Sequence, residues 1–196
     1  MRIVHADDRL IVVDKPAGLL SVPGRSETDC ASARVQALYP DALIVHRLDQ
    51  ATSGLLLFGR GAAAQRELSA VFAARRVAKV YVAIVAGQLH GEGLIDLPLG
   101  PDWPNRPRQQ VDLARGKASQ TRWQVLAHEG PHTRVRLEPL TGRTHQLRVH
   151  LAALGHAILG DALYAAPDVA AASPRLLLHA SELGVSDNYF TVSPEF

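Results

Sequence analysis

The chain of 196 residues contains little of what several protein classes require. It has one cysteine, Cys30, which excludes an internal disulfide and a cysteine-rich zinc site. None of its apolar runs approaches the roughly 20 residues that a membrane-spanning helix needs. The first residues continue directly into a strand-like pattern, without the apolar core of a signal peptide. We therefore expect a cytoplasmic protein that does not span a membrane.

Motifs for common cofactors and nucleophiles are also missing. There is no Gly-x-Gly-x-x-Gly pattern and no P-loop, so a nucleotide cofactor has no recognisable site. Ser53 lacks the Gly-x-Ser-x-Gly elbow, which leaves little support for a serine hydrolase. His145 and His150 would be separated by about 500° on a helix, which makes them a poor metal pair. We expect neither a metal ion nor a cofactor.

The net charge of +2 conceals a marked asymmetry. Residues 102–150 hold nine Lys or Arg against four Asp or Glu, whereas residues 151–196 hold one against five. A positive face of this kind suits a polyanion such as RNA. The alternative is that the arginines are scattered over a solvated surface, and spacing alone does not separate the two interpretations.

Periodicity predicts many strands and few helices. The Pro-rich segment 97–111 is expected to be a long loop, because its four prolines exclude a helix or a central strand. The expected combination of many strands with few helices indicates an α+β fold with a mixed or antiparallel sheet, in one domain or in two closely packed subdomains. Helices are expected at 29–38, capped by Asp29, and at 145–154, with Leu147, Leu151 and Leu154 on its apolar stripe. A third helix is expected at 62–73, with Leu68, Val71 and Phe72 on one face. Strands are expected at 2–5, 10–14, 43–45, 55–58, 77–85, 119–127, 133–138, 175–185 and 189–192. The strands 119–127 and 133–138 are expected to pair antiparallel around a turn at 129–131.

The polar segment 46–54 lies between two β-favouring apolar runs and carries Asp49 in its middle. A loop held between two buried strands is a frequent position for catalytic groups. The alternative is a connecting turn in which Asp49 caps backbone N–H groups.

Two further segments could carry chemistry. Tyr81 interrupts the apolar strand 79–83, either as a functional phenol or as a core tyrosine with a satisfied hydroxyl. Residues 140–150 place a glycine turn, Arg143 and histidines at the start of a helix. That arrangement predicts an anion site, or alternatively a capped helix with exposed basic residues.

These three segments together resemble the RluA family of pseudouridine synthases. The likeness covers essentially the whole chain, and residues 20–25 and 102–107 resemble the RluA branch, which modifies large-subunit ribosomal RNA and the anticodon stem-loop of transfer RNA. The matching motifs, in the family's order, are His46-Arg47-Leu48-Asp49-x-x-Thr52-Ser53-Gly54, Lys79-x-Tyr81-x-Ala83 and Thr141-Gly142-Arg143-Thr144-His145-Gln146-Leu147-Arg148-Val149-His150. The upstream Val13-Asp14-Lys15-Pro16-Ala17-Gly18-Leu19 also fits.

The resemblance implies the pseudouridine synthase fold, a mixed and mostly antiparallel central sheet flanked by helices and loops, with an active-site cleft across its middle. It implies a single catalytic domain over residues 1–196, without the S4-like RNA-binding domain that many relatives carry. All RNA contacts would then come from the catalytic domain. In the absence of heptad repeats we expect a monomer.

The resemblance also assigns roles to residues. Asp49 is the essential carboxylate, which either attacks the sugar or base or removes a ribose proton, and Arg143 is its cationic partner. Tyr81 packs against the target base and accepts the C5 proton late in the reaction. Leu147 forms an apolar wall of the uracil pocket, or alternatively is a plain core leucine.

The expected RNA contacts extend beyond these groups. Arg47 is placed to fill the space of a flipped base, and Thr52 is assigned to substrate binding. Arg106 and Arg108 of the Pro-rich loop are candidate phosphate contacts, as are Arg75, Arg76 and Lys79. Trp103 either stacks on a base or anchors the loop as a buried side chain.

The expected function is therefore an isomerase that converts specific uridines of structured ribosomal or transfer RNA to pseudouridine. The alternative is a non-catalytic RNA-binding module with the same fold. Such a module would need the basic face but not Asp49, Tyr81 and Arg143 together.

Overall fold

The computed structural model describes residues 1–196 and divides the chain into two compact units. The first unit comprises Met1–Lys79 with His179–Glu195, and the second comprises Val80–Leu178 with Phe196. Neither unit contains a helix that is long and apolar enough to cross a membrane.

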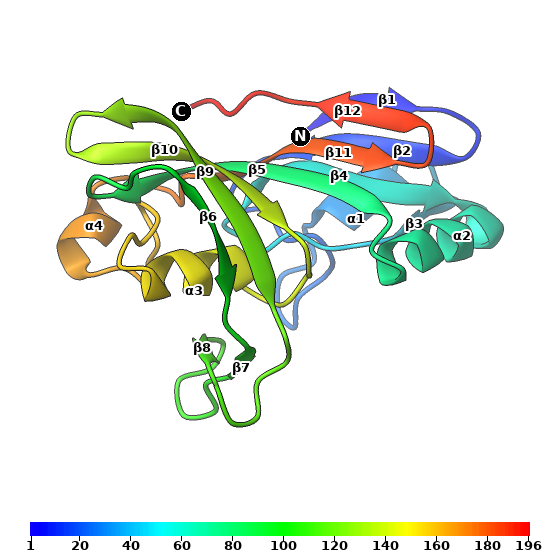
Figure 1. The fold of residues 1–196 in the computed structure, drawn as a ribbon. Helices are drawn as coiled ribbons and strands as arrows, with labels where there is room; N and C mark the ends of the chain where they lie inside the picture. The colour runs from blue at the N-terminus through cyan, green and yellow to red at the C-terminus, as the bar shows by residue number, and fades with distance from the viewer. The chain divides into compact units, whose positions relative to one another are not determined.

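A mixed sheet forms the first unit (Figure 1). Its strands run in the order β1-β2-β4-β11, with β12 added to β11 and β3 added to β4. The pair β4–β11 is parallel, whereas the other pairs are antiparallel, as the expected mixed sheet requires. The strands are β1 (Arg2–Ala6), β2 (Leu10–Lys15), β3 (Ala42–Ile44), β4 (Ser53–Arg60), β11 (Leu178–Val185) and β12 (Asn188–Thr191).

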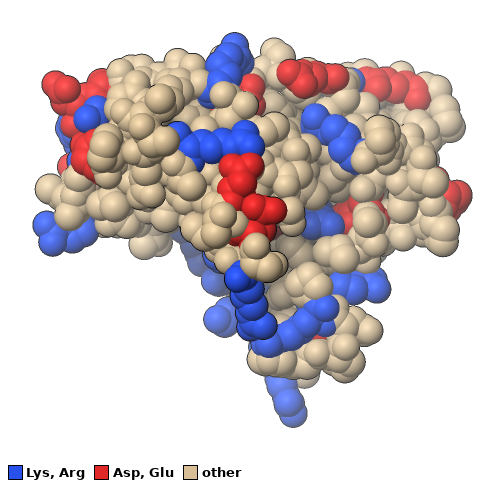
Figure 2. All heavy atoms as spheres, turned by 180° about the vertical axis from the view of Figure 1, so that it is seen from behind, with Lys and Arg blue, Asp and Glu red and all other residues tan.

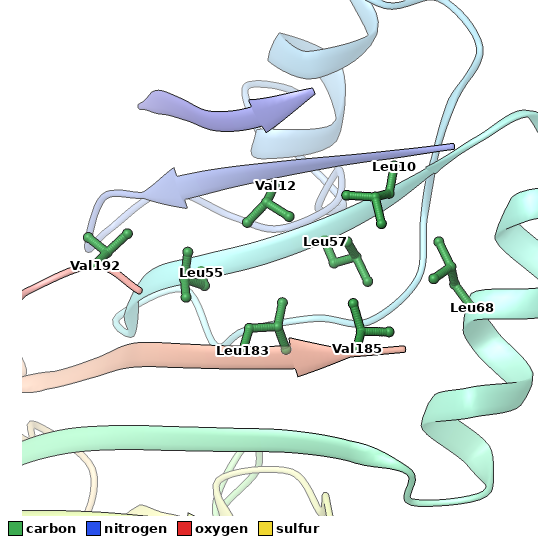
Figure 3. Packing of buried hydrophobic residues seen from close by; sticks show 8 residues of the cluster. All are labelled: Leu10, Val12, Leu55, Leu57, Leu68, Leu183, Val185 and Val192. Carbon is green, nitrogen blue, oxygen red and sulfur yellow. The ribbon is translucent and has the colours of Figure 1, made fainter. Parts of the chain in front are cut away.

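The core of this unit joins the sheet to the helix α2 (Gly61–Ala73). Figure 3 shows Leu68 of this helix beside Leu57 and Val185 of the strands. Val71 and Phe72 pack against the same cluster, so the predicted apolar face of the helix is confirmed. Burying a side chain as completely as that of Leu68 contributes roughly 1.5–3 kcal/mol, which holds the helix on the sheet.

The expected cap of the first helix is wrong. The helix α1 (Ala31–Gln36) begins later than predicted, and its N-cap is Cys30, whose sulfur accepts from the Ala33 N–H at 3.4 Å. Asp29 lies one residue too early to reach those N–H groups. Its carboxylate instead accepts from Arg34 Nε at 2.7 Å.

The second unit is built on an antiparallel sheet with the order β5-β10-β9-β6. The predicted hairpin around residues 129–131 is confirmed by the pairing of β9 with β10. Outside the Pro-rich segment two elements were missed, β6 and α4. In β6 only Ile95 is buried, so the strand has no apolar alternation to reveal it. The elements are β5 (Val77–Ala86), β6 (Glu92–Asp96), β9 (Gln120–Glu129), β10 (His132–Pro139), α3 (Gln146–Ala153) and α4 (Pro167–Ala171).

The Pro-rich segment is not wholly a loop. It contains a two-stranded sheet of β7 (Leu99–Pro101) and β8 (Gln109–Val111), at the far end of the excursion that connects β6 to β9 (Figure 1). The prolines exclude a central strand but not a short pair of edge strands. The apolar stripe of α3 is also shorter than predicted, because Leu154 follows the helix and is 39% exposed.

Candidate active site

Asp49 lies in the connection between β3 and β4, and the backbone on both sides of it is held by a neighbouring loop. Ser21 Oγ donates to the Leu48 carbonyl at 2.7 Å and accepts from the Leu48 N–H at 3.1 Å. On the other side, the Gln50 carbonyl accepts from the Gly18 N–H at 2.8 Å. Asp49 itself is partly buried, and its carbonyl accepts from the Thr52 N–H at 3.1 Å. The carboxylate is therefore presented from a loop with little freedom.

Lys15 is the central support of this arrangement. Its side chain is fully buried at the end of β2, and its ammonium donates to the carbonyls of Pro16 at 3.0 Å, Leu19 at 2.7 Å and Gln50 at 3.1 Å. A buried ammonium is costly unless its N–H groups are bonded, and here three carbonyl oxygens accept them. The residue thus joins the strand, its following loop and the segment that carries Asp49.

His46 fixes the start of the same segment. Its Nε2 accepts from the Leu57 N–H at 3.1 Å, and its ring stacks on Phe72 at a centroid distance of 4.6 Å. Burial, together with the charge of Lys79, lowers the pKa of His46 from 6.5 to about 3. The ring is therefore neutral near pH 7, with Nε2 free of a proton so that it can accept.

We expect the depressed pKa of His46 to make the protein less stable in acid. A histidine whose folded pKa lies below its unfolded value contributes stability that is complete above pH 6.5 and is lost as the pH falls toward about 3. Its contribution should fall by at most about 1.4 kcal/mol per pH unit. Urea unfolding between pH 7 and pH 4 should show a shallower decline for His46→Gln than for the wild type. Equal slopes would contradict this account.

The other loop residues differ in exposure. Arg47 is exposed, whereas Thr52 is 2% exposed and directly precedes β4. Ser53 Oγ lies 2.9 Å from His179 Nδ1, and His179 Nε2 lies 3.2 Å from the Val192 carbonyl. Because a carbonyl only accepts, Nε2 carries the proton and Ser53 donates to Nδ1. Both side chains of this pair are buried, so it is not an accessible hydrolytic nucleophile.

In the second unit, Tyr81 lies on β5 opposite Leu137 of β10. It is partly buried, and so is not enclosed as a core tyrosine would be. Leu147, on α3, is buried.

The turn that carries Arg143 is held by the buried side chain of Gln146. Its Oε1 accepts from Thr141 Oγ1 at 2.7 Å and from the Arg143 N–H at 3.0 Å, while its Nε2 donates to the Gln120 carbonyl at 2.9 Å. The Arg143 guanidinium makes two long bonds of 3.4 Å to the carbonyl of Ala118. These contacts are weak and neutral, so the guanidinium keeps its capacity for a charged partner.

Tyr164 was not anticipated from the sequence, yet it connects α3 to the β7–β8 hairpin. Its hydroxyl accepts from the Gln109 N–H at 2.8 Å and lies 2.6 Å from His145 Nδ1. The Arg108 guanidinium lies over its ring at 5.5 Å. One phenol therefore ties the first residue of β8, next to the turn of the hairpin, to the residue that precedes α3.

The hairpin and the segment after it are basic. Figure 2 shows blue side chains along this protruding part of the surface. Trp103, at the tip, is 65% exposed, so of the two alternatives for this residue the buried anchor is wrong. The exposed basic residues here are Arg106, Arg108, Arg115 and Lys117.

The predicted site residues are divided between the units. Asp49, Arg47 and Thr52 lie in the first unit, and the others lie in the second, namely Tyr81, Arg106, Arg108, Arg143 and Leu147. No group of three or more His, Cys, Asp or Glu side chains in the chain is arranged to hold a metal ion. His145 and His150 bind different partners, since His150 Nδ1 lies 2.9 Å from Thr121 Oγ1.

The chain was compared with protein families and with curated sequences. Residues 9–153 match the model of the RNA pseudouridylate synthase family. The chain is 52% identical over 188 residues to the dual-specificity RNA pseudouridine synthase RluA of Escherichia coli K12, which covers 94% of this chain and 86% of that protein. It is 48% identical over 200 residues to the RluA of Yersinia pestis, covering 100% of this chain and 97% of that protein.

Solved structures show the same fold. Human RNA Pseudouridylate Synthase Domain Containing 1 superposes with a TM-score of 0.83 at 29% identity, covering 99% of this chain and 83% of that one. Human RNA Pseudouridylate Synthase Domain Containing 4 gives a TM-score of 0.76 at 26% identity, with coverage of 93% and 83%. The predicted α+β fold and the family suggested by the three motifs are both confirmed.

Proposed function

The chain belongs to the RNA pseudouridylate synthase family, and we propose that it isomerises specific uridines in both ribosomal and transfer RNA. The observation that carries this proposal is the identity of about half its residues, along nearly its whole length, to synthases named as dual-specificity. A module that only bound RNA would not need a carboxylate on a loop whose backbone is held as firmly as the loop of Asp49. We further propose a cytoplasmic monomer, which the single cysteine and the lack of heptad repeats support.

The reaction breaks the bond between N1 of uracil and C1′ of the ribose and rejoins the base through C5. No atom is gained and nothing is oxidised, so the conversion needs groups that position the base and move a proton. A carboxylate, a guanidinium and a phenol can supply these functions without a redox cofactor.

We assign the central step to Asp49, which acts as nucleophile or as base toward the ribose. Both roles need an ionised carboxylate, and a nearby cation favours that form. We assign the cation to Arg143, whose planar fork can bind both oxygens of a carboxylate. The weak neutral contacts of its guanidinium, at 3.4 Å, support the assignment.

Arg47 is our candidate for opening the RNA. A uridine inside a stem-loop has to leave its stack before it can reach a pocket, which costs a few kcal/mol. Arg47 is exposed and lies two residues before Asp49 on the same supported loop. Its side chain can therefore take the place of the displaced base while the carboxylate contacts the nucleotide.

The remaining assignments of this proposal concern the base and the RNA backbone. Leu147 supplies an apolar surface for the uracil ring, and Arg106 and Arg108 bind phosphates.

Tyr81→Phe separates packing from proton transfer. The phenyl ring keeps the shape that contacts the base but loses the hydroxyl that would accept the C5 proton. We expect the single-turnover rate of pseudouridine formation to fall by about 10²-fold or more, as for other general bases. The dissociation constant for RNA, measured by filter binding, should stay close to the wild-type value. A normal rate would leave Tyr81 with packing alone.

The function is tested by incubating the protein, without cofactors, with ribosomal and transfer RNA labelled at C5 of uridine. Release of the C5 label reports isomerisation, and chemical mapping of pseudouridine identifies the modified positions. We expect label release from both RNA classes. Release from one class would restrict the proposal to that class, and release from neither would overturn it.

A further inference from the structure

The tip of the β7–β8 hairpin presents an aromatic ring to solvent. Trp103 is 65% exposed, and the centre of the Arg106 guanidinium lies 3.8 Å from its ring centroid. Because the guanidinium covers one face of the indole, an exposure this large leaves the opposite face open. A large, exposed aromatic side chain beside basic groups is a frequent mark of a binding surface.

The turn that carries this ring is closed by its own hydrogen bonds. The Asp102 N–H donates to the Arg108 carbonyl at 3.0 Å, and the Arg108 N–H donates to the Asn105 carbonyl at 3.0 Å. The Asn105 amide also donates to both carboxylate oxygens of Asp102, at 3.1 and 3.0 Å. A turn held in this way presents Trp103 in a preset position, so little conformational entropy is lost when a ligand binds.

The strand that follows this turn is also held, because Tyr164 accepts at 2.8 Å from the N–H of Gln109, the first residue of β8. The platform therefore does not move freely with respect to α3, which follows Arg143 in the chain. The surrounding charge is positive, from Arg108, Arg115 and Lys117, all of them exposed. The carboxylate of Asp102 is already engaged by Asn105.

From this geometry we infer that Trp103 and Arg106 form a stacking platform for an unpaired base of the RNA substrate, outside the catalytic residues. The base stacks on the open face of the indole, and the guanidinium stacks on the other face. The neighbouring Arg108 binds a backbone phosphate. The inference rests on the proposed function, because it takes RNA as the ligand.

The platform selects unpaired bases for a physical reason. In a duplex both faces of each internal base are covered by its neighbours, whereas a loop nucleotide can turn a face outward. Stacking on an aromatic side chain is worth about 1–3 kcal/mol per base, which corresponds to roughly fivefold to 150-fold in affinity. The platform thus adds to loop binding and contributes little to duplex binding.

The test compares a hairpin RNA that has a seven-nucleotide loop with a fully paired duplex of equal charge. Intrinsic fluorescence reports on Trp103, because the second tryptophan, Trp123, is only 9% exposed and provides a constant background. Loop RNA should quench the wild type but not Trp103→Phe, and the duplex should quench neither. Trp103→Ala should bind loop RNA at least about fivefold more weakly. Its affinity for the duplex should change less than twofold.

Leu113→Ala is the matched control, because Leu113 is 79% exposed in the same excursion and has no stacking partner in this proposal. It should bind both RNAs as the wild type does. An equal loss of loop and duplex affinity in Trp103→Ala, or the absence of quenching by loop RNA, would overturn the platform. The same comparisons, repeated with every protein carrying Asp49→Asn, should give the same differences. They report binding, so they are independent of whether the protein forms pseudouridine.

Discussion

Asp49→Asn is expected to abolish pseudouridine formation while the RNA still binds. The amide keeps the size of the carboxylate but can neither attack the sugar nor accept a ribose proton at neutral pH. Loss of an essential nucleophile or base in other enzymes lowers the rate by 10²- to 10⁶-fold, so we expect at least about a 10³-fold fall. Release of label from C5 of uridine measures the rate, and filter binding measures the affinity.

The structure explains why the substitution should leave binding intact. The bonds from Ser21 and Lys15 hold the loop through the backbone of Leu48 and Gln50, and these bonds remain when the side chain of Asp49 is replaced. Removing one negative charge should, if anything, strengthen binding to a polyanion. Asp8→Asn makes the same chemical change at an exposed position between β1 and β2 and should have wild-type activity. Substantial turnover by Asp49→Asn would remove Asp49 from its assigned role.

The position of Asp49 could be predicted from the sequence because the signal is local. Two apolar runs predicted β3 and β4, and the polar residues between them had to form their connection. The helix α2 was predicted for the same reason, since its apolar face repeats at helical spacing. Elements without such a local pattern were missed, including β6 and the short helix α4.

The supports that join the site to remote parts of the chain could not be predicted from local patterns. Ser21 and Leu48 are 27 residues apart, Lys15 and Gln50 are 35 apart, and Tyr164 and Gln109 are 55 apart. Nothing in the spacing of the sequence joins these positions. Trp103 shows the same limit, since the sequence was equally compatible with a buried anchor and an exposed ring. Exposure depends on how the hairpin leaves its unit, which is a property of the fold.

The second large effect is expected at a buried ion pair close to Tyr164. Arg148 Nε and a terminal guanidinium nitrogen bind the two oxygens of Asp161 at 2.8 and 2.7 Å, with side-chain exposures of 5% and 1%. One of those oxygens also accepts from the N–H groups of Leu163 and Tyr164, at 3.0 and 3.2 Å. The pair therefore sets the backbone position of the tyrosine that anchors the hairpin.

Arg148→Met should lower the free energy of unfolding by about 3–5 kcal/mol, because it leaves the Asp161 carboxylate buried without its cation. That is a large part of the 5–15 kcal/mol typical of a folded domain, and urea denaturation measures it. Replacing both residues, with Arg148→Met and Asp161→Asn, removes the buried charge while the amide oxygen can still accept from the backbone. The double variant should therefore be more stable than Arg148→Met alone.

The matched control is Arg122→Met, which breaks the exposed pair with Glu138 in the same unit, at 3.2 Å and with 60% of the Arg122 side chain accessible. Solvent screens such a pair, and its loss should cost less than about 1 kcal/mol. Equal costs for Arg148→Met and Arg122→Met would show that burial adds nothing to the pair.

Because the pair positions Tyr164, Arg148→Met should also weaken the binding of loop RNA at temperatures where the variant remains folded. A destabilised variant with unchanged RNA affinity would show that the hairpin is held independently of the ion pair.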